Sequence, residues 1–472
     1  MDTRVLSILA LVAAGCTATI PDGQIVCTVA SPDCPEGFTC CASGASGAYD
    51  GVCRRSACPA SDAGSADAGY DGGVDAGFDA GVDAGPPIPV EVAAGAEHTC
   101  LRLSDGTVEC WGSNGSGQLG QGVESTTPQT TPIAVMGLAP GALEIEVAHE
   151  ASCARLADKI QCWGSNQVPL SSAPGPIGSD VMRSPVPRDV ALGGSTPHQL
   201  AMGNYHACAI VGDARSLVCW GYNADGQLGI GTRTSSAVPA EVPGLSGVID
   251  VCAAAEHTCA ALDTGELYCW GHATHGQLGI GEPSAMTQRT SPERVALSDV
   301  VEVECGYLHT CAITDDGTTR QTWCWGENRR GETQQDELTS PVLEPTAFRD
   351  PRGGMITRIA IGGGTNLFTV THGFTLIDGP TSRLAGFGEN TDDQLGLGAS
   401  APDFSSLPLA TVEVAETVID VSAGGFHACA IDEPAGSARR VLCWGAGGRG
   451  RLGNASERGV DRPTPVFGYD GT

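Results

Sequence analysis

The last four fifths of the chain has the hydrophobic pattern of short β-hairpins. Apolar and polar residues alternate over 98–103, an Asp-Gly pair follows at 105–106, and the alternation resumes over 107–112. Alternation on both sides of an Asp-Gly turn predicts two antiparallel strands with one buried face. A single hairpin of this length cannot bury that face alone, so neighbouring units have to stack.

The hairpin phrase recurs seven times and has three anchors, of which the third is clear in three copies, altered in two and blurred in the second and fifth. The first copy carries His98-Thr99-Cys100, then Cys110-Trp111-Gly112, then Gly117-Gln118-Leu119-Gly120. The first anchor is assigned to His98, Ala151, His206, His257, His309, Asn366 and His427. The second is assigned to Trp111, Trp163, Trp220, Trp270, Trp325, Phe387 and Trp444.

This order of motifs resembles the repeat of the regulator of chromosome condensation family. The resemblance implies an all-β fold over 88–472, a seven-bladed β-propeller of four-stranded antiparallel blades. Closing the stacked units into a ring also removes exposed sheet edges. A short Pro-led strand precedes each copy, and the last one, Pro463–Val466, has no copy after it. We therefore expect it to pair into the first blade beside Val90–Gly95.

Paired cysteines flank six of the hairpins and predict six disulfides within blades, since residues directly opposed on two strands come close to disulfide separation. The pairs are Cys100 with Cys110, Cys153 with Cys162, Cys208 with Cys219, Cys259 with Cys269, Cys311 with Cys324 and Cys429 with Cys443. The sixth copy has Phe368 and Gly386 at these positions, so both cysteines are lost together. Metal binding is the rival interpretation, but each strand offers at most two ligands. Cys252 and Cys305 lie one register step apart on equivalent strands, which turns them to opposite faces. A bond between them would require a bulge, and their pairing stays open.

The recurring histidine and tryptophan are interpreted as architecture, because a single active site would need one copy to differ. We expect each imidazole to bond a backbone group beside the hairpin turn, and each indole to pack between blades. His272 and His275 form the one His pair outside the pattern and are expected to be exposed in a Gly-rich turn.

Composition narrows the function further. Gly is 66 of 472 residues and the formal net charge is −30, which disfavours nucleic acid as a partner. The sequence contains no nucleophile elbow, phosphate loop, zincin helix or paired-carboxylate signature. We therefore predict a non-enzymatic protein with no cofactor and no metal.

The N-terminal part predicts export. Residues 1–15 read as a signal peptide, and Ala13-Ala14-Gly15-Cys16 resembles the lipobox of bacterial lipoproteins, which implies lipidation at Cys16. Residues 16–58 hold six further cysteines for which three disulfides of open connectivity are expected, with a zinc site as the alternative. These are Cys27, Cys34, Cys40, Cys41, Cys53 and Cys58. Residues 59–87 repeat Asp-Ala-Gly and predict an extended tether, rather than a calcium-binding repeat.

Function is expected where the copies differ, after the Gly-Gln-Leu-Gly turn. The varying segments are 121–133, 165–188, 280–293, 333–350 and 397–410. The best binding candidate is Gln334, Gln335, Asp336 and Glu337, where the regular turn is overwritten. The sequence thus predicts a monomeric binding module for a protein or glycan, lipid-anchored in the bacterial cell envelope. The alternatives are an extracellular polysaccharide lyase or hydrolase and a structural envelope component.

Overall fold

The chain forms two compact units, residues 1–83 and 84–472. The computed structural model describes residues 25–26, 39–40, 52–54 and 86–471, without 169–170, 179–180, 282–287, 334–340, 349–353, 364–370, 379–382 and 416. In the first unit, β1 (Ile25–Val26), β3 (Val52–Arg54) and β2 (Thr39–Cys40) form a small antiparallel sheet, whose register sets Cys40 opposite Cys53. Cys16 and residues 59–85 of the predicted tether lie outside the described residues. Within the described part, no helix is long and apolar enough to cross a membrane.

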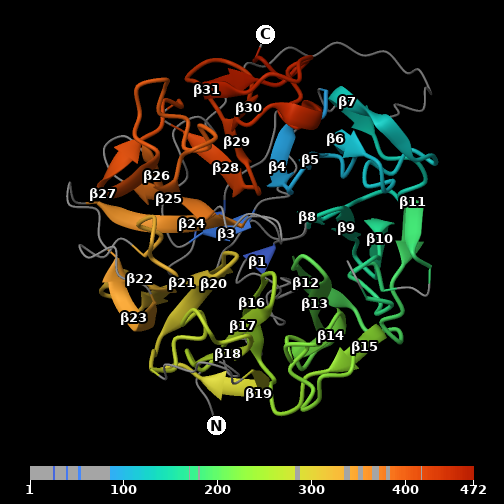
Figure 1. The fold of residues 1–472 in the computed structure, drawn as a ribbon, viewed down its shortest axis with the longest axis vertical. Helices are drawn as coiled ribbons and strands as arrows, with labels where there is room; N and C mark the ends of the chain where they lie inside the picture. Colours follow the sequence, from blue (N-terminus) through green and yellow to red (C-terminus); the bar gives the residue numbers. More distant parts are fainter. Residues whose placement is uncertain are drawn as a thin grey trace, which may run out of the picture. The chain divides into compact units, whose positions relative to one another are not determined.

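The second unit is a ring of seven four-stranded antiparallel sheets around a central channel, which confirms the predicted seven-bladed propeller (Figure 1). The strands of blades 1–4 are β4 (Pro89–Ala94), β5 (His98–Leu103), β6 (Val108–Asn114), β7 (Ser125–Ala134), β8 (Glu144–Val147), β9 (Ala151–Arg155), β10 (Ile160–Ser165), β11 (Arg183–Asp189), β12 (Pro197–Met202), β13 (His206–Val211), β14 (Ser216–Gly221), β15 (Ser236–Glu241), β16 (Val248–Ala253), β17 (His257–Leu262), β18 (Leu267–Gly271) and β19 (Arg289–Arg294). Those of blades 5–7 are β20 (Val300–Cys305), β21 (His309–Asp315), β22 (Arg320–Gly326), β23 (Val342–Phe348), β24 (Met355–Gly363), β25 (Thr371–Asp378), β26 (Arg383–Glu389), β27 (Phe404–Thr411), β28 (Val418–Ala423), β29 (His427–Asp432), β30 (Arg440–Gly445) and β31 (Val460–Pro465), with a 3₁₀ turn at Gly448–Gly450.

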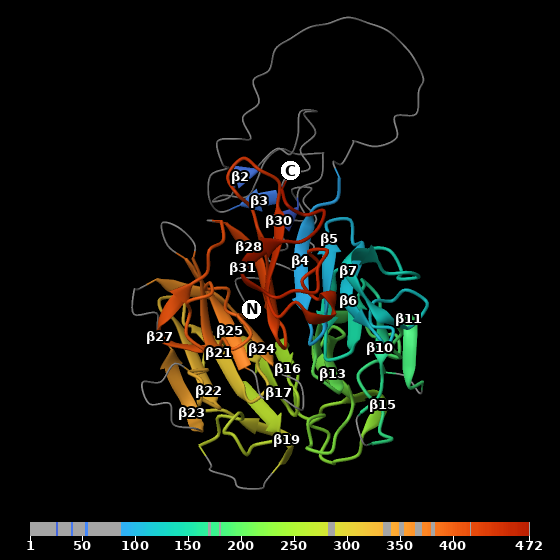
Figure 2. The same cartoon turned by 45° about the horizontal axis from the view of Figure 1, so that its top comes forward.

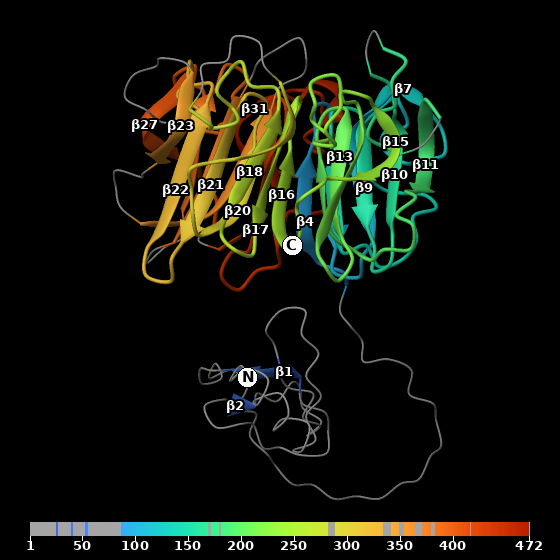
Figure 3. The same cartoon turned by 90° about the horizontal axis from the view of Figure 1, so that it is seen from below.

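The strands of each blade run between two loop-covered faces of the ring (Figures 2 and 3). The turn between the second and third strands lies at one face, which we call the hairpin face. The Gly-Gln-Leu-Gly turn after the third strand lies at the other, which we call the loop face. In blade 1 the hairpin turn is closed by Asp105, whose carboxylate accepts the Thr107 N–H at 2.9 Å, and by Gly106 at φ 79°. Positive φ suits glycine because it carries no Cβ.

The Pro-led strand is the fourth strand of its own blade, so the predicted ring closure is wrong. In the last blade Leu442 of β30 lies opposite Pro465 of β31, and β4 forms the inner strand of blade 1. Blades 7 and 1 are therefore joined by face-to-face packing and side-chain bonds instead of a shared sheet. One such bond runs from the Val92 N–H to the Asp420 carboxylate at 2.7 Å.

The sixth copy is aligned differently from the sequence prediction. His372 lies opposite Gly388 as His98 lies opposite Gly112, so His372 is the recurring histidine of this blade. Asn366 and Phe368 lie outside the described residues, and Phe374 is the residue opposite Gly386. The error arises because 14 residues separate Arg358 from His372, whereas seven separate the equivalent residues in the first copy. The additional residues move the histidine of this copy away from the position that the repeat spacing predicts.

Disulfides close all six predicted hairpins, with Cα–Cα distances of 4.0–4.1 Å. In each blade the two cysteines are directly opposed in the register of the second and third strands, as the sequence predicts. The bonds join Cys100 to Cys110, Cys153 to Cys162, Cys208 to Cys219, Cys259 to Cys269, Cys311 to Cys324 and Cys429 to Cys443. The covalent frame of the hairpins is therefore local, because each of these six bonds stays within one blade.

A seventh disulfide joins Cys252 to Cys305, and it links β16 to β20 of the next blade. The register next to both cysteines is regular, so no bulge turns either side chain. The explanation is that propeller blades stack front to back. A residue on one face of an inner strand therefore meets the opposite face of the next inner strand, and a one-step offset brings the two cysteines together.

Candidate functional site: junctions, channel and loop face

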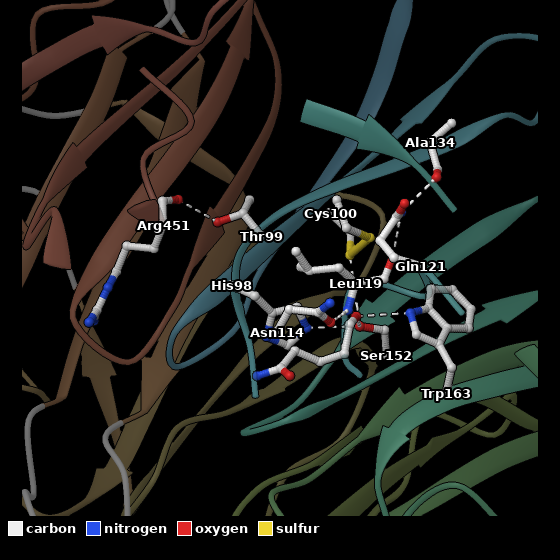
Figure 4. Close-up of a disulfide and its surroundings, with 12 residues drawn as sticks. His98, Thr99, Cys100, Asn114, Leu119, Gln121, Ala134, Ser152, Trp163 and Arg451 are labelled. Carbon is white, nitrogen blue, oxygen red and sulfur yellow. Dashed lines mark hydrogen bonds between the residues drawn. A yellow bond between two sulfur atoms is a disulfide. The ribbon is translucent and has the colours of Figure 1, made fainter. Parts of the chain in front are cut away.

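The recurring histidine joins each blade to the next one. The Nε2 atom of His98 lies 2.8 Å from the Ser152 hydroxyl, and that hydroxyl donates to the Gln118 carbonyl at 3.0 Å (Figure 4). The hydroxyl therefore accepts the Nε2–H, which places the imidazole proton on Nε2. The same contact, at 2.7–2.9 Å, joins His206 to Thr258, His257 to Thr310 and His427 to Thr99. The expected backbone partner is thus wrong, because the partner is a hydroxyl of the neighbouring blade.

The recurring tryptophan uses the same carbonyl oxygen. Trp163 Nε1 donates to the Gln118 carbonyl at 2.9 Å, so one oxygen of the Gly-Gln-Leu-Gly turn accepts two bonds from the next blade (Figure 4). The equivalent bonds are Trp111 to Arg451, Trp220 to Pro176, Trp270 to Gln227, Trp325 to Gln277 and Trp444 to Gln394. All six indoles are fully buried, which confirms that tryptophan packs between blades.

The histidine and the hydroxyl are both absent at one junction, whereas at another only the hydroxyl is absent. Blade 2 has Ala151 at the histidine position, and blade 3 has Ala207 at the matching hydroxyl position. Blade 6 has Gly373 at the hydroxyl position. Among the described residues, His309 Nε2 accordingly has no hydrogen-bond partner. Junctions therefore differ in strength, although the blades share one architecture.

Burial keeps the recurring histidines neutral. The pKa of His98, and equally that of His206, His257 and His309, falls to about 3, chiefly because burial removes water from the charged form. The pKa of His372 falls to about 4 for the same reason. With no exposed surface and a neutral ring, His98, His206 and His257 serve as interblade donors.

A ring of acidic residues joins the inner strands of neighbouring blades, and sequence reasoning missed it. Five of the seven inner strands carry an acidic residue at the same position. Its carboxylate accepts a backbone N–H from the inner strand of the next blade at 2.7–3.2 Å. The residues are Glu91, Glu144, Asp250, Glu302 and Asp420. The signal was available, because each acid stands seven residues before the first-anchor position of its copy.

The channel holds two carboxyl groups beyond those that accept these backbone bonds. Its cavity has a volume of about 210 Å³, and its lining includes Glu146 and Glu304 in addition to Glu91 and Asp420 of the ring. Burial raises the pKa of both carboxyls well above the usual range, and neighbouring acids raise it further. Arg358, 2.5 Å from Asp420, is the cation that faces them within the described lining.

Varying segments of neighbouring blades meet on the loop face. The Gly122 N–H donates to the Pro185 carbonyl at 2.8 Å, and Arg183 pairs with Glu124 at 3.2 Å. Segments 121–133 and 165–188 thus lie side by side. Equivalent backbone bonds join Gly231 to Thr290, Gly281 to Leu343 and Gly398 to Asp461. The segments that vary between copies therefore belong to one rim.

The other predicted site residues have mixed outcomes. Gln334, Gln335, Asp336 and Glu337 lie outside the described residues. Just before them, Glu332 occupies the glutamine position of the turn and accepts the Thr371 hydroxyl at 2.7 Å. The expectation of an exposed His272 is wrong, because its side chain is 20% exposed and contacts Asp225 and Glu256.

Comparison with known proteins agrees with this architecture. Two models described as the regulator of chromosome condensation (RCC1) repeat match the chain, one at 217–261 and 264–313, the other at 90–118, 198–227, 248–277 and 300–332. The ultraviolet-B receptor UVR8 of Arabidopsis thaliana is 29% identical over 385 residues, which cover 79% of this chain and 80% of the receptor. The human probable E3 ubiquitin-protein ligase HERC6 is 28% identical over 318 residues, covering 64% of this chain but 29% of the ligase.

Solved structures show the same fold. Prp20p from Saccharomyces cerevisiae has a TM-score of 0.62 at 19% identity, covering 76% of this chain and 85% of that one. Human WBSCR16 has a TM-score of 0.60 at 20% identity, covering 73% and 87%. From the repeat matches, the relatives and the seven-bladed ring, we conclude that the chain carries RCC1 repeats and has an RCC1-like propeller fold.

Proposed function

We propose that this protein is a non-catalytic binding module that presents the loop face of its propeller to a protein partner. The chain is exported, anchored through a lipid on Cys16, and held away from the membrane by its Asp-Ala-Gly tether. This proposal assigns the repeated residues to the scaffold and recognition to the residues that differ between copies.

The observation that carries the proposal is an exposed apolar pair on the varying rim. Val123 is 61% exposed and Met182 is 66% exposed. Each stands next to one member of the Glu124–Arg183 pair, which joins blades 1 and 2. An apolar group beside a paired charge suits the core and rim of a protein interface. It fits a glycan less well, because sugars are recognised mainly through hydrogen bonds.

Two further observations support a protein partner. The repeated histidines are buried and already hydrogen-bonded or enclosed at junctions, so they are accounted for without chemistry. Two solved structures of relatives concern Prp20p with its binding properties to Gsp1p and histones, and Kap60 bound to yeast RCC1 (Prp20). This fold can therefore hold proteins on its surface.

The test compares two double variants of the full chain. Val123→Ser with Met182→Ser should abolish capture of the partner from the cell envelope, as quantified by mass spectrometry after cross-linking. Val301→Ser with Met355→Ser is the matched control, because these side chains are also exposed but lie toward the hairpin face. Both variants should keep the wild-type melting temperature, since exposed substitutions change stability by less than about 0.5 kcal/mol. Loss of the same captured protein in both variants, or in neither, would refute the assignment to the loop face.

Anchoring is tested separately. Cys16→Ser should move the protein from the detergent phase to the aqueous phase, because it removes the acceptor for the lipid. Unchanged partitioning would remove the anchoring part of the proposal and leave the binding face untouched.

A further inference from the structure

Three potential metal ligands converge on the loop face where blade 3 meets blade 4. Asp225 lies in the turn after β14, Glu256 between β16 and β17, and His272 directly after β18. His272 Nδ1 lies 3.3 Å from Asp225 Oδ1 and 3.4 Å from Glu256 Oε2, and one donor atom from each residue lies within 4.8 Å of the others. The side chains are 17%, 36% and 20% exposed for Asp225, Glu256 and His272. The set is therefore enclosed on the protein side and open to water on the other.

At two other junctions the same three positions hold one carboxylate bonded to one donor. At the junction of blades 1 and 2, Ser116 donates to Glu150 at 3.0 Å. At the junction of blades 5 and 6, Arg330 pairs with Glu389 at 3.1 Å. In each case one carboxylate meets one donor. The junction of blades 3 and 4 differs because two carboxylates share a single imidazole nitrogen.

The distances fit a shared ion better than a shared proton. A charge-assisted N–H···O bond is about 2.7–2.9 Å long, and one Nδ1–H points at one acceptor at a time. Both distances here are longer and nearly equal. Tetrahedral zinc with bonds of about 2.0–2.2 Å separates its ligand atoms by about 1.6 bond lengths, or about 3.3–3.6 Å. We propose that Asp225, Glu256 and His272 form a site for a divalent transition-metal ion, with Zn²⁺ as the ion that best suits one nitrogen and two carboxylate ligands.

The surroundings orient the ligands as a metal site requires. His272 Nε2 lies 2.6 Å from the Thr274 hydroxyl, which lies 3.0 Å from His275 Nδ1. When Thr274 accepts the Nε2–H and donates to His275, the Nδ1 lone pair of His272 faces the two carboxylates. Gln288 donates to Asp225 at 3.3 Å. A hydrogen bond to the second ring nitrogen and another to a ligating carboxylate are usual features around protein-bound zinc.

The ion would connect two blades, with water completing its coordination on the open side. Asp225 comes from blade 3, and the other two ligands come from blade 4. Binding would therefore stabilise this junction, because one ion would hold side chains of both blades. This inference does not depend on the proposed protein partner.

The experiment measures Zn²⁺ binding by the full chain, and the visible absorption of Co²⁺ as a spectroscopic substitute. Wild type should bind one equivalent more than His272→Ser, a change that copies Ser113 and Ser165 at the same position of blades 1 and 2. Asp225→Ser, which copies Ser116 of blade 1, should lose the same equivalent. Thr274→Ala should retain it with affinity about 10-fold weaker, as expected for loss of a bond that orients a ligand.

His275→Ser is the matched control and should keep the Co²⁺ spectrum, because His275 supplies no ligand atom: its Nδ1 lies 3.0 Å from the Thr274 hydroxyl and its ring stacks 6.3 Å from that of His272. The melting temperatures without metal verify that each variant is folded. Zn²⁺ should then raise the melting temperature of wild type and of His275→Ser, but not that of His272→Ser. Equal stoichiometry in wild type and folded His272→Ser, or equal loss in the His275→Ser control, would overturn the site.

Discussion

The sharpest test of the junctions is removal of one recurring histidine and measurement of the loss at two pH values. His257→Ala deletes a fully buried ring and its 2.9 Å contact with the Thr310 hydroxyl. Lost packing and one hydrogen bond together predict a destabilisation of about 2–4 kcal/mol near neutral pH. In a double-mutant cycle, His257→Ala and Thr310→Ala should couple by about 1 kcal/mol. His309→Ala is the control: its Nε2 has no partner among the described residues, so its loss should be about 1 kcal/mol smaller.

The pH dependence follows from the depressed pKa. Burial lowers the pKa of His257 from 6.5 to about 3, so below pH 6.5 the unfolded chain binds a proton that the folded chain does not. The contribution of this ring is complete above pH 6.5 and is lost progressively as the pH falls toward 3. The variant has no such proton. The penalty of His257→Ala should therefore shrink by about 1.4 kcal/mol from pH 7.5 to pH 5.5, since one pKa unit corresponds to that energy.

The assay is guanidinium unfolding of wild type and variant, followed by tryptophan fluorescence with the disulfides intact. Taking the difference between the two proteins cancels the opposing effect of the channel carboxylates, whose pKa values burial raises. A penalty that is equal at both pH values, or larger at the lower one, would show that His257 is not neutral when folded.

Two further predictions concern individual blades. Gly229→Ala should cost about 1–3 kcal/mol more than Gly244→Ala in thermal or guanidinium unfolding. Both glycines have positive φ, but a Cβ at Gly229 would lie 2.6 Å from Nε1 of Trp270, whereas one at Gly244 meets nothing within 4 Å; equal costs would contradict the close-packing role. Amide hydrogen exchange should be faster in β25 and β26 of blade 6 than in β17 and β18 of blade 4, and uniform protection would contradict the weak-blade argument.

The fold was predictable because its signal is a repeat. Alternation, the turn residues and the paired cysteines each fix local geometry, and seven copies agree on it. In contrast, contacts between blades join residues about 50 positions apart, such as His98 and Ser152, and no local pattern names such a partner. The predicted backbone partner of the histidine failed for this reason. The acidic ring is a different case, because its regular spacing is visible in the sequence but its five members gain a common role only when the inner strands surround one channel.

The candidate site was predictable only as a region. The varying segments were identified, and the structure shows that the described ones lie on one face. Which of these segments meet across a junction depends on which edges of neighbouring blades face each other. Asp225, Glu256 and His272 stand in three separate turns spread over 48 positions of the chain, so proximity emerged only with the fold. The Cys252–Cys305 bond shows the same limit, since front-to-back stacking of blades reversed an argument from sheet faces.

Blade 6 shows where the ring is least secured. It has Phe374 and Gly386 in place of a disulfide, and Phe387 in place of an indole donor. His309 of blade 5 and His372 of blade 6 stand at the two junctions of this blade. Neither has an Nε2 partner among the described residues. The junction between blades 7 and 1 has more hydrogen bonds, because Trp111 and Thr99 both donate to the Arg451 carbonyl. The ring should therefore open first beside blade 6. The first and last blades meet at a different junction, between blades 7 and 1.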